Sequence, residues 1–147
     1  MSLKHKIFHK KFDNLSRKEI HDLFLLRSEV FVVEQNCVYQ DIDGKDKLAK
    51  HVLGFEKKEL IAYSRIFKPG DYFKEASFGR AVVKKSYRGK GIGDNLVKIS
   101  IEQFEEKKIK ISAQSYLKSF YSSHGFKAEG KEYLEDGIPH TAMFLKK

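Results

Sequence analysis

The chain has 147 residues, of which 41% are hydrophobic and 33% are charged, and its formal net charge is +9. This composition excludes widespread disorder, and the length suits one domain, residues 1–147, with one hydrophobic core. The positive charge favours anionic partners, but it does not choose between nucleic acids, acidic proteins and polyphosphate compounds.

Cysteine and hydropathy indicate where the chain resides. Cys37 is the only cysteine, so an internal disulfide and a thiolate-rich metal site are both excluded. No apolar run reaches the roughly 20 residues that span a bilayer, and the segment from Met1 to His5 lacks the apolar core of a secretory signal. We therefore expect a cytoplasmic protein that enters no membrane. We also expect no metal, because Asp41 and Asp43 lack further oxygen ligands at a recognisable spacing.

The first half of the chain predicts one helix and four strands. Ser16 and Glu19 have the S-x-x-E spacing of a capping box, so a helix begins after Ser16. Apolar residues at steps of three and four predict that this helix continues to about Asn36. Turn-forming residues indicate a loop at 39–44. Strands are expected at 7–12, 51–56, 60–67 and 77–84, of which the second and third form a hairpin.

The second half continues the alternation of helices and strands. An amphipathic helix is expected from Ile92 to Phe104, and a third helix at 115–124 is followed by Gly125 at its C-terminal cap. Strands are expected at 110–113, 126–133 and 141–145, the last two joined by a turn at 135–137. This order predicts one α/β domain with a mixed sheet.

Three glycines stand between the fourth strand and the second helix. Gly89, Gly91 and Gly93 leave backbone N–H groups uncovered at a helix N-terminus, where a phosphate group is held well. The segment is neither a Walker A loop nor a G-x-G-x-x-G motif. A simple turn is the alternative for such a motif in isolation.

The loop and a later segment together match the motifs of a known family. The loop from Arg88 to Gly93 reads R-x-x-G-x-G, and the later segment 120–126 reads F-Y-x-x-x-G-F. With these motifs the chain resembles the GNAT acetyltransferases over nearly its whole length, and residues 26–44 and 136–140 are similar to the ElaA-like branch. The resemblance implies a mixed, mostly antiparallel central sheet with flanking helices. It also implies direct transfer of an acetyl group from acetyl-coenzyme A to an amine.

The resemblance also implies a cofactor site. Two neighbouring strands splay apart in that fold, and the pantetheine of acetyl-coenzyme A binds between them along the backbone of Ala81, Val82 and Val83. The pyrophosphate would be held by the loop residues Arg88, Gly89, Lys90, Gly91, Ile92 and Gly93. Gln114 stands where many members have asparagine beside the cofactor.

Catalysis requires a base, because an amine with a pKa near 10 must lose a proton before it attacks. Glu34 and His140 are the candidate bases, ranked equally. The resemblance assigns Tyr121 to protonating the departing thiolate, and a backbone N–H near Val82 or Val83 to stabilising the oxyanion. The alternatives to these catalytic roles are that Tyr121 only packs in the core, that Glu34 is a solvated helix residue, and that His140 is a strand histidine whose hydrogen bonds are satisfied within the fold.

Two other functions compete with this interpretation. A basic nucleic-acid-binding module without catalysis would explain the net charge, but the chain has no recognised nucleic-acid motif, so we expect no specific nucleic-acid partner. The segment from Leu26 to Phe31 is similar to the start of the acyl-homoserine lactone synthases, although the chain is short for that group. The sequence identifies neither the acceptor amine nor the oligomeric state, a homodimer included.

Overall fold

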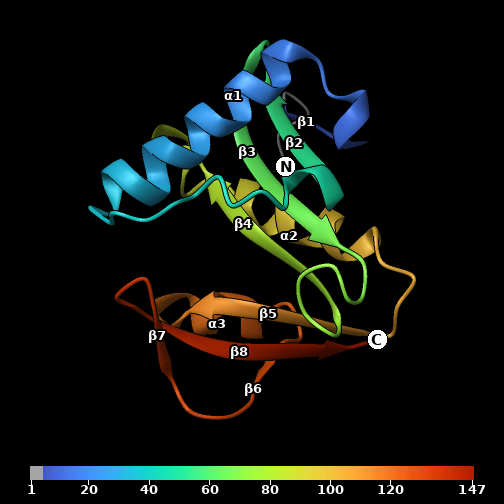
Figure 1. The fold of residues 1–147 in the computed structure, drawn as a ribbon, viewed down its shortest axis with the longest axis vertical. Coiled ribbons are helices and arrows are strands. Elements are labelled where there is room, and N and C mark those ends of the chain that lie inside the picture. The colour runs from blue at the N-terminus through green and yellow to red at the C-terminus, as the bar shows by residue number, and fades with distance from the viewer. Residues whose placement is uncertain (1–4) are drawn as a thin grey trace.

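Eight strands form one mixed sheet in the computed structural model, which describes residues 5–147 (Figure 1). The strands are β1 (His5–Lys11), β2 (Lys50–Glu56), β3 (Glu59–Phe67), β4 (Ala76–Val83), β5 (Lys108–Gln114), β6 (Lys127–Ala128), β7 (Tyr133–Glu135) and β8 (Ile138–Lys146). Their order in space is β1-β2-β3-β4-β5-β8-β6, with β7 also paired to β8. Among the strands of residues 5–147 only β4 and β5 pair in parallel, which confirms the mixed, mostly antiparallel sheet.

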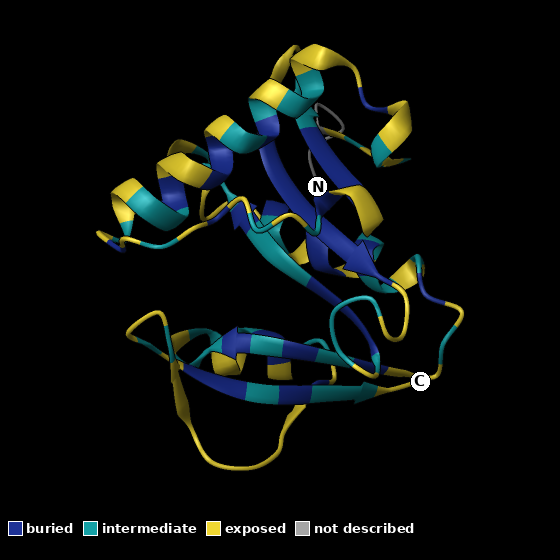
Figure 2. Cartoon of the chain, in the orientation of Figure 1, coloured by how far each residue is buried: buried dark blue, intermediate teal, exposed yellow. Residues whose placement is uncertain are grey.

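Helices cover both faces of this sheet. They are α1 (Arg17–Arg27), α2 (Ile92–Glu102) and α3 (Lys118–Ser122). Successive strand residues point to opposite faces, so Leu53 packs with Leu23 of α1 while its neighbour Val52 belongs to the cluster around Leu96 of α2. Figure 2 shows that β3 is buried over almost its whole length and that β2 is buried in its middle. The sheet is therefore the middle layer between two hydrophobic cores.

The first helix begins as the sequence predicts. Ser16 Oγ accepts a hydrogen bond from the Glu19 N–H at 3.0 Å, and the Ser16 N–H donates to Glu19 Oε1 at 2.8 Å, which completes the capping box. After Arg27 the chain winds on as a π-helical segment, Ser28–Glu34, in which the Gln35 N–H donates to Val30 O. The predicted helix to Asn36 is thus helical to Glu34, but its last two turns are wider than an α-helix.

The C-terminal strands differ from the prediction. The expected strand at 126–133 is instead two short strands, β6 and β7, which pair with different parts of β8. Gly130 lies between them at a φ of 80°, a left-handed conformation that interrupts an extended strand. The expected helix at 115–124 is a 3₁₀ turn, Ser115–Leu117, followed by the short α3. Gly125 does follow it in a left-handed conformation, with a φ of 94°.

The parallel pair β4 and β5 separates soon after it forms. Ala76 pairs with Ile109 and Ser77 with Lys110, and no later residues of the two strands are paired. Figure 1 shows the strands diverging from this point toward the end of β4 that leads to α2. We call this divergence, from residues 78–83 on β4 and 111–114 on β5, the splay.

Within residues 5–147 no helix combines the length and apolarity needed to cross a bilayer. The prediction about a secretory signal rests mainly on residues 1–4, which lie outside the described residues.

Candidate active site

The splay opens into a cavity of about 490 Å³. One end is bordered by the glycine-rich loop before α2, and the other by the aromatic residues Phe67, Tyr72 and Phe73. The walls between these ends come from β4, β5, α3, the π-helical segment and the turn between β7 and β8. A ligand in this cavity would therefore contact several segments that lie far apart in the sequence.

The glycine-rich loop leaves space for a ligand against its backbone. Gly89 and Gly91 have left-handed φ angles of 77° and 80°, and Gly91 is the N-cap of α2. At both glycines no atom lies within 4 Å of the position that a Cβ would take. The first N–H groups of α2, which have no partner within the helix, are therefore accessible from the cavity side. Such a cradle fits a pyrophosphate group.

Two other residues of the loop have side chains that are engaged away from the cavity. Lys90 Nζ lies 5.3 Å from the centre of the Tyr87 ring, and the side chain of Ile92 is buried in the core with α2. Neither side chain lines the cavity. Gly93 stands closer to the core, since a Cβ there would lie 3.7 Å from Phe120 Cζ.

The backbone of β4 presents hydrogen-bonding groups to the splay. The Lys84 N–H donates to Ile61 O of β3 at 2.7 Å, so the alternation of strand residues turns the backbone groups of Val82 toward β3 as well. Those of Ala81 and Val83 point the other way, and Val83 O accepts a hydrogen bond from Arg88 Nε at 2.9 Å. Of the two expected oxyanion donors, the Val82 N–H faces β3, so the geometry favours the N–H of Val83, or that of the neighbouring Ala81, and this role stays a prediction.

Arg88 and Glu34 bind each other. Arg88 Nη1 donates to Glu34 Oε2 at 2.6 Å and Nη2 donates to Oε1 at 3.0 Å, a bidentate pair between the loop and the π-helical segment. These hydrogen bonds lower the pKa of the Glu34 carboxyl from its ordinary value. Arg88, the expected phosphate ligand, and Glu34, one of the two expected bases, are thus brought together, and each satisfies the hydrogen-bonding groups of the other.

Gln114 is also paired across the cavity. Its side-chain amide and that of Gln35 exchange two hydrogen bonds, each 3.2 Å long. Gln114 ends β5, and Gln35 follows the π-helical segment. Because glutamine has a longer side chain than asparagine, Gln114 reaches from β5 to the end of the π-helical segment.

Tyr121 lies in the apolar floor of the cavity. It is 7% exposed, and its ring is 5.1 Å from that of Phe120 and 6.3 Å from that of Phe78. Its hydroxyl makes no hydrogen bond to any other described residue, and burial raises the pKa of Tyr121 above its ordinary value of 10.0. Tyr121 is therefore a neutral hydrogen-bond donor with no acceptor among residues 5–147.

The imidazole of His140 is held by a backbone carbonyl at the start of β8. Its Nδ1 lies 2.7 Å from Ile138 O, and because a carbonyl oxygen only accepts, Nδ1 carries the proton. In the neutral form of the ring Nε2 then carries the lone pair, and this atom lies 3.5 Å from Glu135 Oε2. Ser112 Oγ donates to Glu135 Oε1 at 3.2 Å, and the Tyr133 ring stacks on the imidazole at a centroid distance of 6.2 Å. A buried imidazole with a carboxylate beside it suits proton transfer.

The sequence missed a cluster of buried ion pairs beside the cavity, which we call the Arg–Asp cluster. It comprises Arg27, Arg65, Arg80, Asp41, Asp43 and Asp46. The loop at 39–44 was expected and is present, but its aspartates face inward. Burial alone would raise the pKa of Asp43, but the hydrogen bonds from Arg65 and from the Lys45 N–H, together with the charges of Arg65 and Arg80, outweigh burial and lower this pKa. The three aspartates within six residues were the only signal, because their arginine partners lie far away in the sequence.

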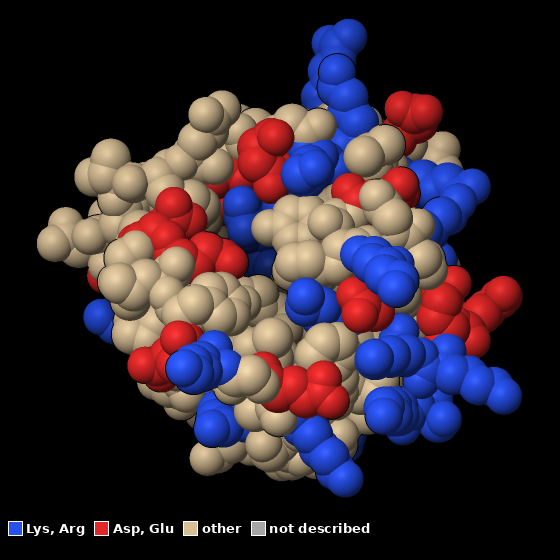
Figure 3. Space-filling model, turned by 60° about the horizontal axis from the view of Figure 1, so that its bottom comes forward, with Lys and Arg blue, Asp and Glu red and all other residues tan. Residues whose placement is uncertain are grey.

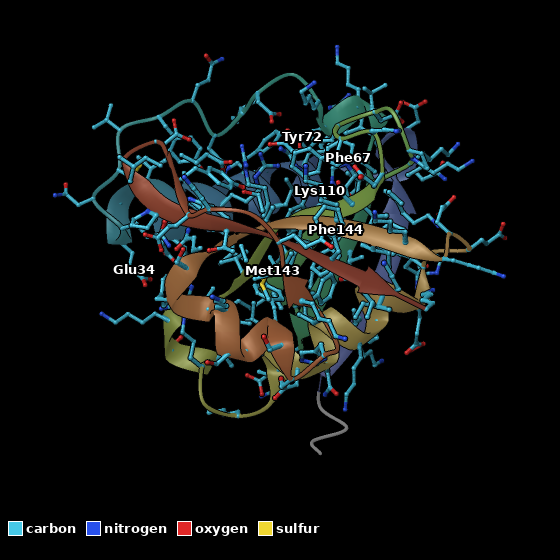
Figure 4. The ribbon with its side chains drawn as sticks, turned by 90° about the horizontal axis from the view of Figure 1, so that it is seen from below. Glu34, Phe67, Tyr72, Lys110, Met143 and Phe144 are labelled. Carbon is cyan, nitrogen blue, oxygen red and sulfur yellow. The ribbon has the colours of Figure 1, made fainter. Side chains whose placement is uncertain are left out.

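The far end of the cavity is aromatic. The Phe67 and Tyr72 rings stack at 5.0 Å, and Lys110 Nζ lies 4.5 Å from the centre of the Phe73 ring. Figure 4 shows Phe67, Tyr72 and Lys110 grouped together, with Glu34 well apart on the other side of the molecule. The two ends of the cavity therefore differ in chemistry.

Charge is unevenly distributed over the surface. On the face drawn in Figure 3, most Lys and Arg side chains lie to the right and below, while a group of acidic side chains lies to the left of a central hollow. Among the described residues no three His, Cys, Asp or Glu side chains are arranged to hold a metal ion.

Comparison with known proteins gives close relatives. A family model described as an acetyltransferase (GNAT) domain matches residues 13–147. The chain is 42% identical to Protein ElaA of Escherichia coli (strain K12) over 135 residues, which is 88% of each chain. It superposes on the crystal structure of Escherichia coli ElaA with a TM-score of 0.90 at 37% identity, covering 97% of this chain and 99% of that one.

Two further solved structures share the fold. An acyl-CoA N-acyltransferase from Pseudomonas aeruginosa superposes with a TM-score of 0.88 at 33% identity, covering 95% of this chain and 99% of that one. A GNAT family acetyltransferase from Elizabethkingia anophelis with acetyl-CoA bound superposes with a TM-score of 0.64 at 16% identity, covering 99% of this chain and all of that one, a likeness of fold alone.

Proposed function

Because the chain belongs to the GNAT acetyltransferase family, in its ElaA-like branch, we propose that it transfers an acetyl group from acetyl-coenzyme A directly to a primary amine. The splay carries this proposal. The pairing of β4 with β5 ends after two residue pairs, so the backbone groups of Ala81 and Val83 face an open cavity instead of a neighbouring strand. An extended pantetheine can occupy the vacant strand position. The bound acetyl-CoA in the Elizabethkingia relative adds support from the shared fold.

The chain's own groups bind the donor at three places. The N–H groups at Gly91 and Gly93 hold the pyrophosphate at the start of α2, where the helix dipole favours an anion. The backbone of Ala81 and Val83 holds the pantetheine. Arg88 adds a charged contact once it releases Glu34, which makes the Arg88 to Glu34 pair a competitor of donor binding.

His140 is the base that we favour over Glu34. His140 lines the cavity, and Glu135 Oε2 lies 3.5 Å from its Nε2, where it stabilises the imidazolium that forms when the acceptor's ammonium group gives up a proton. Glu34 is less suited, because its hydrogen bonds from Arg88 lower its pKa and make its carboxylate a poorer base. The deprotonated nitrogen then attacks the thioester carbonyl carbon, and the second proton that this nitrogen loses as the amide forms passes through water to the departing sulfur.

Two groups of the chain stabilise the charge that develops. The N–H of Ala81 or of Val83 donates to the carbonyl oxygen as it becomes negative. As the carbon–sulfur bond breaks, Tyr121 donates a hydrogen bond to the departing sulfur. Burial raises the Tyr121 pKa, and a thiol has a pKa of about 8.5, so a hydrogen bond is favoured over full proton transfer, and water completes protonation.

Binding of coenzyme A tests the donor half of this proposal. A ligand at a hundredfold excess over its dissociation constant stabilises the folded state by about 2.7 kcal/mol. For a domain of this size that is a rise in the melting temperature of roughly 5–10 °C. Thermal melts with and without millimolar coenzyme A measure it, and an unchanged melting temperature would remove the proposal's main support.

A further inference from the structure

Arg80 adopts an unusual backbone conformation in the middle of β4. Its φ is 50°, in the left-handed region that residues with a Cβ seldom enter. The register shows why: Val82 pairs with Tyr63 and Gly79 with Arg65, so Arg80 and Ala81 together lie opposite the single residue Ser64. This is a β-bulge, and it lies in the wall of the splay. A left-handed conformation persists only where the surroundings hold it.

The side chain of Arg80 is anchored on the loop opposite. Its Nε donates to Asp41 Oδ1 at 2.8 Å and its Nη2 donates to Asp41 O at 3.2 Å. The guanidinium also lies 5.5 Å from the centre of the Tyr39 ring. Only 15% of the Arg80 side chain is exposed, so water competes little with these contacts.

Asp41 is itself fixed from the other side. Arg27, on α1, donates from Nε to Asp41 Oδ2 at 2.9 Å and from Nη2 to Asp41 O at 2.8 Å. The Tyr39 hydroxyl donates to Asp41 Oδ1 at 2.6 Å. Asp41 therefore connects the β4 bulge to α1, and the position of the Arg80 side chain is set by a buried frame.

We propose that Arg80 is a positioning residue whose anchored side chain holds the β4 bulge in the conformation that turns the Ala81 N–H into the splay. The N–H of Ala81 belongs to the peptide unit that follows Arg80, so the Arg80 backbone angles set its direction. This inference rests on the proposed acetyl transfer, for which that N–H is a candidate donor to the developing oxyanion. Arg80 acts through the backbone and does not touch the reacting atoms.

Two variants separate anchoring from contact with a substrate. Arg80→Ala and Arg80→Gly both remove the guanidinium and leave Asp41 equally short of a partner. Glycine, however, adopts a φ of +50° without the steric cost that alanine meets. We expect Arg80→Ala to lower kcat by roughly 5–30-fold with little change in KM for acetyl-coenzyme A, and Arg80→Gly to recover most of that loss. Lys108, an exposed β5 residue with an ordinary φ, is the matched control, where glycine should be no better than alanine.

A crystal structure of Arg80→Ala gives a readout that needs no activity. The expected result is a φ of residue 80 outside the left-handed region, with the bulge rearranged. If wild-type protein acetylates no amine but the bulge rearranges, the acetyl-transfer proposal fails and the anchoring role stands. If wild-type protein is active and Arg80→Gly is as impaired as Arg80→Ala, or if the bulge persists in the alanine variant, the anchoring role is overturned.

Discussion

Removing one oxygen atom, in Tyr121→Phe, tests the role of the buried tyrosine. The ring contacts with Phe78, Phe120 and Phe126 remain, and the hydroxyl has no partner among the described residues. The melting temperature and the affinity for coenzyme A should therefore change little. Only the interaction that forms with the departing sulfur is lost.

The size of the kinetic effect follows from the environment of Tyr121. Burial raises its pKa above 10.0, whereas a thiol has a pKa of about 8.5, so full proton transfer is uphill by more than about 2 kcal/mol. A hydrogen bond to a charged group contributes about 1.5–3 kcal/mol. We therefore expect kcat to fall by roughly 10–150-fold, less than the 10⁴-fold that efficient acid catalysis can supply.

Single-turnover measurements at saturating substrates isolate the chemical step. Because the folded pKa of Tyr121 is raised, the wild-type rate should show no loss from ionisation of this residue below about pH 10. An unchanged rate in a folded Tyr121→Phe protein would make Tyr121 a packing residue and refute its role at the sulfur.

Three further predictions follow from the site. Gly91→Val places a branched side chain where the φ is 80° and a ligand is expected, so the coenzyme A shift in thermal melts should vanish while the protein stays folded, and a persisting shift would contradict the cradle. His140→Gln should lower kcat by roughly 10²–10⁴-fold, whereas Glu34→Gln should lower it by less than about tenfold; the reverse order in steady-state assays would make Glu34 the base. The pKa of Asp43 is lowered in the folded state, so its ionised carboxylate stabilises the protein above its ordinary pKa of 3.8, and this stabilisation is lost as the pH falls below that value. In denaturant unfolding, the free energy of unfolding of Asp43→Asn should therefore depend less on acid pH than that of wild type. An equal pH dependence in the two proteins would refute this assignment.

Local sequence signals predicted the elements that local physics determines. The capping box at Ser16, the hairpin between β2 and β3 and the left-handed Gly125 depend on neighbouring residues, and all three are confirmed. The π-helical segment was missed because the apolar pattern of residues 28–34 is shared by both kinds of helix. The break at Gly130 was missed because β6 and β7 are defined by their pairing with β8, which is a long-range contact.

In the candidate site too, local features could be predicted from the sequence and long-range contacts could not. The glycine-rich loop could be predicted as a candidate because glycines before a helix form a local pattern; Gly89 and Gly91 have left-handed φ angles, and their role in holding a phosphate stays a prediction. The Arg88 to Glu34 pair joins residues 54 positions apart, and no local pattern indicates such a contact. The bulge at Arg80 could not be predicted either, since it is defined by the pairing of β4 with β3, and the contact of Arg80 with Asp41 joins residues 39 positions apart.

Acetyl transfer itself is the most direct test. Wild-type protein is incubated with acetyl-coenzyme A and a panel of monoamines, polyamines and peptides, and free thiol and acetylated product are measured together. We predict acceptor-dependent thiol release matched by acetylated amine, and its loss in His140→Gln. Acetyl-coenzyme A that binds the protein but is consumed no faster than in buffer, with every acceptor in the panel, would contradict the proposed function.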